Sequence, residues 1–315
     1  FQGFSYGFRP GRGQHDALDA LSVGLTRRRV NWVLDTDIQS FFDKMSHDWI
    51  LQFLQHRIGD HRVLRLIRKW LTVGIMTDNG RLAGVEGAPQ GAVISPLLAN
   101  IYLHYVLDLW TRQWRSRNAR GDVIIVRYAD DVVLGFEFES EGRRYERQLQ
   151  DRLAAFGLNL HPDKTQLIRF GRLARQNQRQ LDGGKPPTFD FLGFTHYCTI
   201  SRAYGHFVVG RKTIKKRMVS SVKEIKRQLR VRLHDPIGHT GEWLRRVVQG
   251  HLNYFAVPGN SKSLQFYLFR VRRYWLRSLR RRSQRTRMNW ERFRLLCARF
   301  LPPIRITHPG GRQLP

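Results

Sequence analysis

Two apolar runs rich in β-branched residues, at 123–126 and 132–134, flank a short polar break that reads Tyr128-Ala129-Asp130-Asp131. The pattern predicts a β-hairpin with buried strands and an exposed turn. The break contains no Gly, Asn or Pro, the residues that form such turns at low cost. Two adjacent carboxylates at the tip of a rigid hairpin repel each other, so the pair indicates a bound cation and a further carboxylate that shares it.

A second strand-like run, at residues 32–38, supplies a candidate for that carboxylate. It reads WVLDTDI and is followed by QSFFD. Asp37 is the candidate ligand, and Asp35 competes for the role because it lies two residues earlier on the same strand face. Such strands would place two or three carboxylates around a pair of hard divalent cations, which stabilise the attacking and leaving oxygens of phosphoryl transfer.

Further motifs accompany these two in a fixed order along the chain. They are SYGFRPGRG at 5–13, GAPQGAVISPLLANIYLHYVLD at 87–108, LNLHPDKT at 158–165 and FLGF at 191–194. Together with DIQSFFD and YADD, they resemble the reverse transcriptase/maturase proteins encoded by group II introns. The resemblance implies an α+β right-hand polymerase, with fingers and a palm built on an antiparallel sheet, followed by an all-α basic thumb.

The resemblance also implies the chemistry of the carboxylates. Asp37, with Ile38 beside it, and Asp130 would hold two Mg²⁺ ions most directly, with Asp131 close behind. A primer 3′-hydroxyl, deprotonated near one ion, would attack the α-phosphate of a dNTP while the second ion carries the pyrophosphate charge. Lys164 would serve the leaving pyrophosphate as a charge or a proton donor, although a surface strand lysine is the plainer alternative.

Structural roles are expected for the acidic residues on either side of Asp37. Asp35 is expected to be structural or to stand outside the direct ligands, and Asp43 to cap the helix that follows. For Asp37 itself, a capping or loop position is the alternative to metal binding.

Three residues are expected at the incoming nucleotide. Phe42 stands five residues after Asp37, where the family places a bulky ring under the sugar; such a ring excludes a 2′-hydroxyl and implies a DNA product. Core packing is the alternative for Phe42, and Phe41 is the expected core residue of the pair. Gln90, in a Pro-Gln-Gly turn, would contact the nucleotide, and Arg9 the template or the triphosphate.

The net charge of +30 is concentrated in the C-terminal part of the chain. Residues 201–315 contain 28 Lys and Arg against 4 Asp and Glu, whereas residues 1–200 contain 27 against 21. Such a region repels itself unless a polyanion neutralises it, and nucleic acid is the expected partner. A basic membrane-surface region is the alternative, but the sequence contains no stretch of about 18 apolar residues, and no membrane partner is expected.

Helical patterns cover 213–233, 241–256, 262–283 and 289–300. The third has an apolar stripe that is expected in the core, namely Leu264, Tyr267, Leu268, Val271, Trp275 and Leu279. A second stripe carries Arg270, Arg273, Arg277 and Arg280, and no acid occurs between Glu242 and Glu291. We therefore expect this stripe to contact phosphate, a role that suits the planar donors of Arg, rather than to be an ordinary solvated face. Leu192 and Gly193 in FLGF resemble the grip that holds the primer terminus.

The domain organisation follows from the same patterns. Fingers and palm are expected over 1–210, a helical thumb over 211–300 and a tail over 301–315. Other expected elements are helices at 14–29, 47–57 with Ser46 as N-cap, 61–72 and 142–156, and a long helix with Ser95 as N-cap and Pro96 at its first position, running to residue 115. A loop or hairpin is expected at 77–91 and a loop at 171–188.

The chain has only two cysteines, Cys198 and Cys297, and no CxxC pair. This usage is typical of a reducing cytoplasm, and a bacterial type of ribonucleoprotein-associated protein is expected. No zinc-stabilised endonuclease domain is expected in these residues.

The expected function is RNA-directed DNA synthesis on group II intron RNA, from a DNA or RNA primer and dNTPs, together with binding and splicing assistance of that RNA. Three alternatives stay open: an RNA-binding maturase without polymerase activity, a domesticated or CRISPR-associated reverse transcriptase, and an RNA-dependent RNA polymerase. The chain begins at Phe1 and lacks the finger blocks that similar proteins carry upstream, so binding is the safer expectation for this piece.

Overall fold

The computed structural model describes residues 1–72, 75–77, 80–82, 87, 93–174, 184–201, 205–282 and 288–308. The chain divides into two compact units, Phe1–Thr188 with Cys198–Val209, and Phe189–Tyr197 with Gly210–Pro315. The assignment of fingers and palm to 1–210, of a thumb to 211–300 and of a tail to 301–315 stays a prediction. Within the described ranges, no helix combines the length and the hydropathy that a membrane span requires.

The first unit is built on a four-stranded antiparallel sheet. Its order is β4 (Val123–Tyr128), β5 (Asp131–Phe136), β1 (Trp32–Thr36) and β6 (Gln166–Arg169). β4 and β5 pair from Val123↔Phe136 to Tyr128↔Asp131, which confirms the predicted hairpin. The expectation of an exposed turn is wrong for Ala129, which is 8% exposed.

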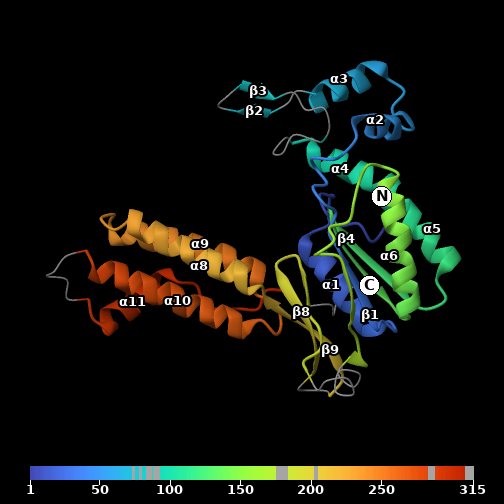
Figure 1. The fold of residues 1–315 in the computed structure, drawn as a ribbon. Helices are drawn as coiled ribbons and strands as arrows, with labels where there is room; N and C mark the ends of the chain where they lie inside the picture. The colour runs from blue at the N-terminus through green and yellow to red at the C-terminus, as the bar shows by residue number, and fades with distance from the viewer. Residues whose placement is uncertain are drawn as a thin grey trace. The chain divides into compact units, whose positions relative to one another are not determined.

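Helices cover both faces of this sheet, as the alternation of side chains along β4 requires. Ile124 meets Gly24 of α1 (Gln14–Arg27) on one face. Ile125 lies on the other, in the cluster formed with α4 (Ser95–Leu103), a π-helical turn (His104–Asp108), α5 (Leu109–Asn118) and α6 (Glu139–Ala154) (Figure 1).

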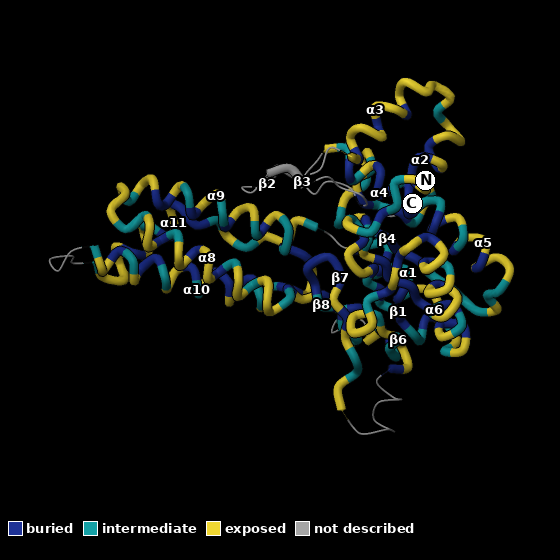
Figure 2. Tube along the Cα trace, turned by 45° about the horizontal axis from the view of Figure 1, so that its top comes forward, coloured by how far each residue is buried: buried dark blue, intermediate teal, exposed yellow. Residues whose placement is uncertain are grey.

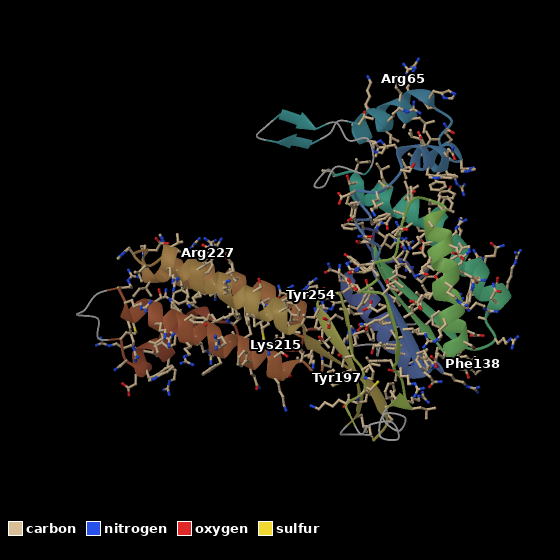
Figure 3. All side chains as sticks on the ribbon, in the orientation of Figure 1. Arg65, Phe138, Tyr197, Lys215, Arg227 and Tyr254 are labelled. Carbon is tan, nitrogen blue, oxygen red and sulfur yellow. The ribbon has the colours of Figure 1, made fainter. Side chains whose placement is uncertain are left out.

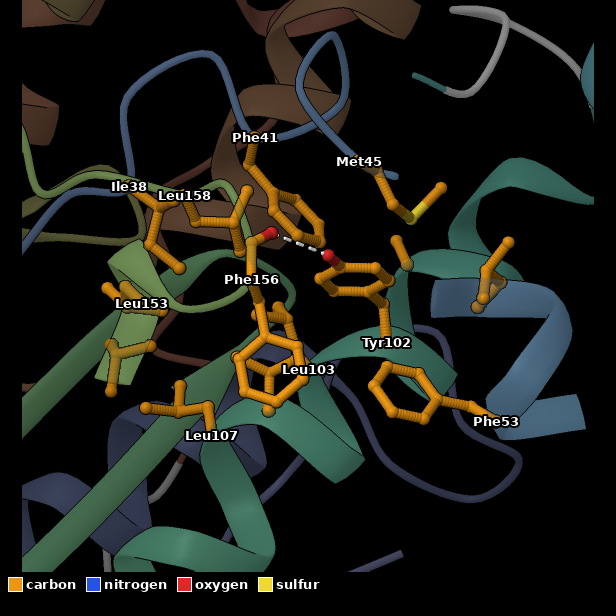
Figure 4. Close-up of a cluster of buried hydrophobic side chains, with 14 of the residues drawn as sticks. Ile38, Phe41, Met45, Phe53, Tyr102, Leu103, Leu107, Leu153, Phe156 and Leu158 are labelled. Atoms are coloured by element: carbon orange, nitrogen blue, oxygen red, sulfur yellow. Dashed lines mark hydrogen bonds between the residues drawn. The ribbon is translucent and has the colours of Figure 1, made fainter. Parts of the chain in front are cut away.

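Aromatic side chains join α2 (His47–Gln55) to this core. The Phe53 ring packs edge-to-face against Tyr102, whose buried hydroxyl donates to the Phe156 carbonyl at 2.8 Å (Figure 4). The remaining elements of this region are α3 (His61–Thr72), β2 (Ile75–Thr77) and β3 (Gly80–Leu82).

Two helix starts test the capping predictions. The Ser46 side chain accepts from the Trp49 N–H, so Ser46 is the N-cap of α2 and the expectation for Asp43 is wrong. The prediction for Ser95 is also wrong, because the Leu98 N–H already bonds to the Ile94 carbonyl and the first turn therefore starts one residue earlier. Pro96 still lies in the first turn, where its missing N–H costs nothing.

The second unit contains a helix bundle and part of a three-stranded sheet, since the end of β8 and the start of β9 belong to the first unit. Strands β7 (Phe189–Phe191), β8 (Phe194–Ile200) and β9 (Phe207–Thr213) are neighbours in that order. The helices are α8 (Lys215–Val231), α9 (Ile237–Phe255), α10 (Ser261–Arg280) and α11 (Trp290–Phe300) (Figure 1). Buried and exposed residues alternate along them (Figure 2), and the predicted apolar stripe of α10 is confirmed as part of their shared core.

Candidate active site

The tip of the β4–β5 hairpin is a strained turn. Because Tyr128 pairs with Asp131, only Ala129 and Asp130 form the connection. Ala129 has φ 56°, a left-handed conformation that glycine adopts more readily. Surrounding contacts must therefore hold this turn in place.

Arg127 provides the central contact. Its side chain is fully buried, and its Nε and Nη2 donate to the two carboxylate oxygens of Asp108, each at 2.7 Å. Nη1 donates to Asn100 Oδ1 at 3.0 Å and to the Ala129 carbonyl at 2.9 Å. One guanidinium thus ties the strained turn to the helical layer behind the sheet.

The N-terminal segment supports the turn from the other side. The Arg127 N–H donates to the Phe4 carbonyl at 2.9 Å, and the Tyr6 N–H donates to the Arg127 carbonyl at 2.8 Å. Gly7 lies against the turn so closely that a Cβ on it would stand 2.4 Å from the Ala129 nitrogen. The SYGF motif is thereby placed as backbone support for the aspartates.

Arg9 is engaged within the same segment. Its Nη1 donates to the carbonyls of Gln2 and Ser5, each at 2.7 Å. Burial, followed by the charges of Arg12 and Arg127, lowers its pKa. A contact with template or triphosphate stays a prediction and would have to use the other nitrogens of its guanidinium.

Asp37 is positioned by the neighbouring strand. β1 pairs with β5 as far as Thr36↔Val132, and the next pair in this register would be Asp37 and Asp131, on one face of the sheet. The Asp37 carbonyl accepts from the His161 N–H at 2.8 Å, which fixes the backbone at this point. Ile38 points its side chain into the core, where it is 4% exposed.

Lys164 joins the carboxylates from a third segment. Its Nζ lies 2.7 Å from Asp37 Oδ2, and this hydrogen bond, with the charges of Asp37 and Asp131, raises the lysine pKa. The pKa of Asp130 is raised mainly by burial and also by the charge of Asp37, while a backbone hydrogen bond and Arg127 lower it. Asp37 therefore interacts with both Asp130 and Lys164, and Asp131 with Lys164, at one end of the sheet.

The donor set has the chemistry of a site for hard cations. Among the described residues, no three His, Cys, Asp or Glu side chains stand ready as a metal cluster. In the observed arrangement the Lys164 ammonium, itself a cation, neutralises Asp37. The charge of Asp37 contributes to raising the pKa of Asp130, and carboxylate oxygens are the ligands that Mg²⁺ prefers.

The nucleotide-binding predictions are only partly covered by the structure. Phe41 is 3% exposed, which confirms it as the core residue of the pair. Phe42 is half-buried, with its ring 5.3 Å from that of Phe41, and retains accessible surface. Gln90 lies outside the described residues.

The predicted primer grip belongs to the second unit. Leu192 and Gly193 form the turn between β7 and β8, with φ values of 46° and 84°. The Leu192 carbonyl accepts from the Tyr254 hydroxyl at 2.8 Å, and the Gly193 carbonyl from the Ile214 N–H at 3.1 Å. The turn is thus anchored to the helices of its own unit.

The predicted arginine stripe of α10 is uneven. Arg273, Arg277 and Arg280 are exposed, whereas Arg270 is half-buried and donates to the Tyr274 hydroxyl at 2.6 Å. Arg280 also donates to the Met288 carbonyl at 3.3 Å. Three of the four guanidinium groups are therefore accessible.

Sequence reasoning missed Asn100, Asp108 and Arg127. The available signal was a pair of polar residues spaced through the apolar helix ANIYLHYVLD, and an arginine inside an apolar strand. Buried charges occur in pairs, so these residues indicated a partnership.

Comparison with known proteins places these features in a family. A family model described as reverse transcriptase (RNA-dependent DNA polymerase) matches residues 1–196. The chain is 41% identical over 174 residues to an uncharacterized 91 kDa protein in the cob intron of Schizosaccharomyces pombe, covering 55% of this chain and 21% of that protein. It is 36% identical over 113 residues to the group II intron-encoded protein LtrA of Lactococcus lactis subsp. cremoris, covering 35% and 18%.

Two further similar proteins are a curated protein and a solved structure, both of lower sequence identity to this chain. Protein YkfC of Escherichia coli is 32% identical over 200 residues, covering 53% of this chain and 52% of that protein. A telomerase structure from Candida albicans, solved with a fragment of telomeric RNA, has a TM-score of 0.47 and 15% identity, covering 94% of this chain and 51% of that one. The chain spans between about a fifth and a half of the length of these three curated relatives.

The expected α+β fold and the resemblance to group II intron-encoded proteins are both confirmed. Because the family model matches more than half of its residues, the chain belongs to the reverse transcriptase family.

Proposed function

We propose that this chain is an RNA-directed DNA polymerase of the group II intron type. The carrying observation is the convergence of Asp37, Asp130, Asp131 and Lys164 from three separate segments on one end of the sheet. Carboxylates that repel one another are costly to bring together, and binding of cations for phosphoryl transfer offsets that cost.

Each residue has a distinct task in this proposal. Asp37, Asp130 and Asp131 would hold two Mg²⁺ ions, which supply charge neutralisation and activation of the primer 3′-hydroxyl when bound. Lys164 keeps its proton, because its carboxylate partners raise its pKa, and so can neutralise or protonate the leaving pyrophosphate. The substrates would be an RNA template, a DNA or RNA primer and dNTPs.

Primer extension on an RNA template tests the assignment. The double variant Asp130→Ala/Asp131→Ala should lose extension, and removal of Mg²⁺ with a chelator should do the same. Asp151→Ala is the matched control, because this exposed acid lies on α6 and should leave extension unchanged. Extension by the double variant at the wild-type rate would contradict the proposal.

Phe42 is the proposed sugar gate. Phe42→Ala should raise the incorporation of ribonucleotides relative to deoxyribonucleotides, since the ring would no longer exclude a 2′-hydroxyl. Phe41→Leu, which alters the neighbouring core residue, is the control and should leave the sugar preference unchanged. Efficient ribonucleotide incorporation by the unaltered chain would favour an RNA polymerase instead.

A second function, binding of intron RNA with assistance of its splicing, is supported by the charge of the second unit. Arg273, Arg277 and Arg280 are exposed on α10, in the C-terminal region of net charge +24. Replacing all three with Gln should weaken RNA binding and lower the slope of log affinity against log salt by about one per lost phosphate contact. Splicing stimulation that survives in the Asp130→Ala variant would separate this role from polymerisation.

A further inference from the structure

A pocket of about 520 Å³ opens beside the first turn of α6, and none of the roles above uses it. Its lining residues are Arg120, Phe138, Ser140, Glu141, Arg144 and Arg147. Phe138 directly precedes the helix and is 46% exposed (Figure 3). β5 separates it from Asp131 by roughly 20 Å of extended chain, so the pocket is remote from the carboxylates.

Glu141 carries an unmet hydrogen-bonding capacity. The residue is 5% exposed, and its Oε1 accepts from the Arg120 backbone N–H at 2.6 Å. Its Oε2 is buried and finds no hydrogen-bond donor within the described part of the chain. A buried acceptor without a donor is costly, so a donor from a water molecule or from a ligand in the pocket would stabilise this oxygen.

The same pocket has a surplus of positive charge. Within the described ranges, Arg120, Arg144 and Arg147 form no ion pair with a carboxylate. Arg120 and Arg147 are exposed, whereas Arg144 packs against Trp114 and has a buried Nε without an acceptor. The lining therefore suits a ligand with an anionic group at one end and an N–H donor at the other.

The exposed aromatic ring of Phe138 indicates which class of ligand fits this pocket. Base–aromatic stacking is a common means of holding unpaired nucleotides, and a carboxylate accepts well from the amino group of cytosine. We infer that this pocket binds a nucleotide whose base carries an amino group. The phosphate lies at Arg120 and Arg147, the base stacks on Phe138, and the amino group donates to the Glu141 carboxylate, which turns to present Oε2 to the pocket. The nucleotide is either free or an unpaired residue of a bound RNA.

Equilibrium dialysis of the full chain against CMP and UMP tests the inference. CMP should bind roughly tenfold more tightly than UMP, because UMP presents a carbonyl to Glu141. Glu141→Gln keeps an acceptor for the Arg120 N–H but places an N–H toward the base, so it should abolish the preference for CMP.

Two further variants act on the other contacts. Phe138→Ala and the double variant Arg120→Ala/Arg147→Ala should each weaken CMP binding by roughly tenfold, and these exposed side chains can be removed without loss of the fold. Arg115→Ala is the matched control, because this exposed arginine of α5 does not line the pocket. Equal affinity for CMP and UMP, or unchanged CMP binding in both variants, would overturn the inference.

The pocket is separable from the proposed polymerase site. Asp130→Ala should leave CMP binding unchanged, so a failure of one proposal does not imply a failure of the other. Ultraviolet crosslinking with oligocytidylate then identifies the source of the nucleotide: a crosslink on the Phe138 peptide that CMP competes away assigns an unpaired RNA residue, and CMP binding without such a crosslink assigns a free nucleotide.

Discussion

Replacing Asp108 with alanine would leave the guanidinium of Arg127 buried without its carboxylate. Both side chains are fully buried, and Asp108 accepts two hydrogen bonds of 2.7 Å from Arg127. The remaining partners, Asn100 and the Ala129 carbonyl, are neutral and cannot compensate the charge. We therefore expect a loss of about 3–5 kcal/mol of unfolding free energy, the usual cost of breaking a buried ion pair.

Removing both charges should have a much smaller effect on stability. The double variant Asp108→Leu/Arg127→Met fills similar volume with apolar groups, which is often neutral or stabilising. The Ala129 carbonyl and Asn100 Oδ1 both lose their donor in this variant, at a cost of about 1 kcal/mol each. Primer extension should nevertheless be lost in both variants, because the strained turn that carries Asp130 is no longer held.

Native-state hydrogen exchange of the β4 and β5 amides is the appropriate measurement, since it reports opening of this unit alone. Glu139→Ala is the control: its ion pair with Arg143 is on the surface, where the arginine side chain is 62% exposed, and should contribute at most about 1 kcal/mol. A double variant as unstable as Asp108→Ala, or a single variant as stable as the wild type, would refute the reasoning.

Three further outcomes follow from the geometry and the pKa shifts. Asp130→Asn should raise the urea midpoint of unfolding near pH 7, because burial and Asp37 raise the Asp130 pKa and make its charged form costly in the folded chain. This gain should vanish near pH 3, where the Asp130 carboxyl is protonated in both the folded and the unfolded chain. Gly7→Ala should reduce primer extension by roughly 100-fold, because the added Cβ displaces the hairpin turn. Gly3→Ala is the control and should have no effect, because the space around its Cβ is open. Equal effects of the two variants would contradict this account. Burial lowers the pKa of His196 to about 3, so the unfolded chain binds a proton that the folded chain does not, and stability falls as pH drops below about 6.5; His196→Phe should remove this loss, as unfolding curves over that range would show.

The sequence was sufficient for the elements with strong periodicity. The hairpin with its Asp130 turn, the Ser46 cap and the buried stripe of α10 could all be predicted, because each depends on residues that are close along the chain. That Asp37 lies close to the Asp130 turn could be expected only from the family motifs, since the local sequence pattern does not determine the order of strands in a sheet.

The supports of the site could not be predicted in the same way. Arg127, Asn100 and Asp108 each read as an isolated polar residue in an apolar segment, and their pairing depends on how a helix lies on a sheet. Gly7 belongs to a conspicuous motif, but its contact with the Ala129 backbone links residues more than a hundred positions apart. Ser95 failed as a cap because the preceding residues already turn, which composition does not reveal.

The π-helical turn at His104–Asp108 accommodates one residue more than an α-helical turn. Its hydrogen bonds span five residues rather than four, so deleting one residue here would restore ordinary winding and leave α4 and α5 in nearly the same phase. Asn100 would then keep its contact with Arg127, and Thr111 its contact with Tyr145. The same deletion within α4 or α5 would rotate one helix by about 100° and separate one of these pairs.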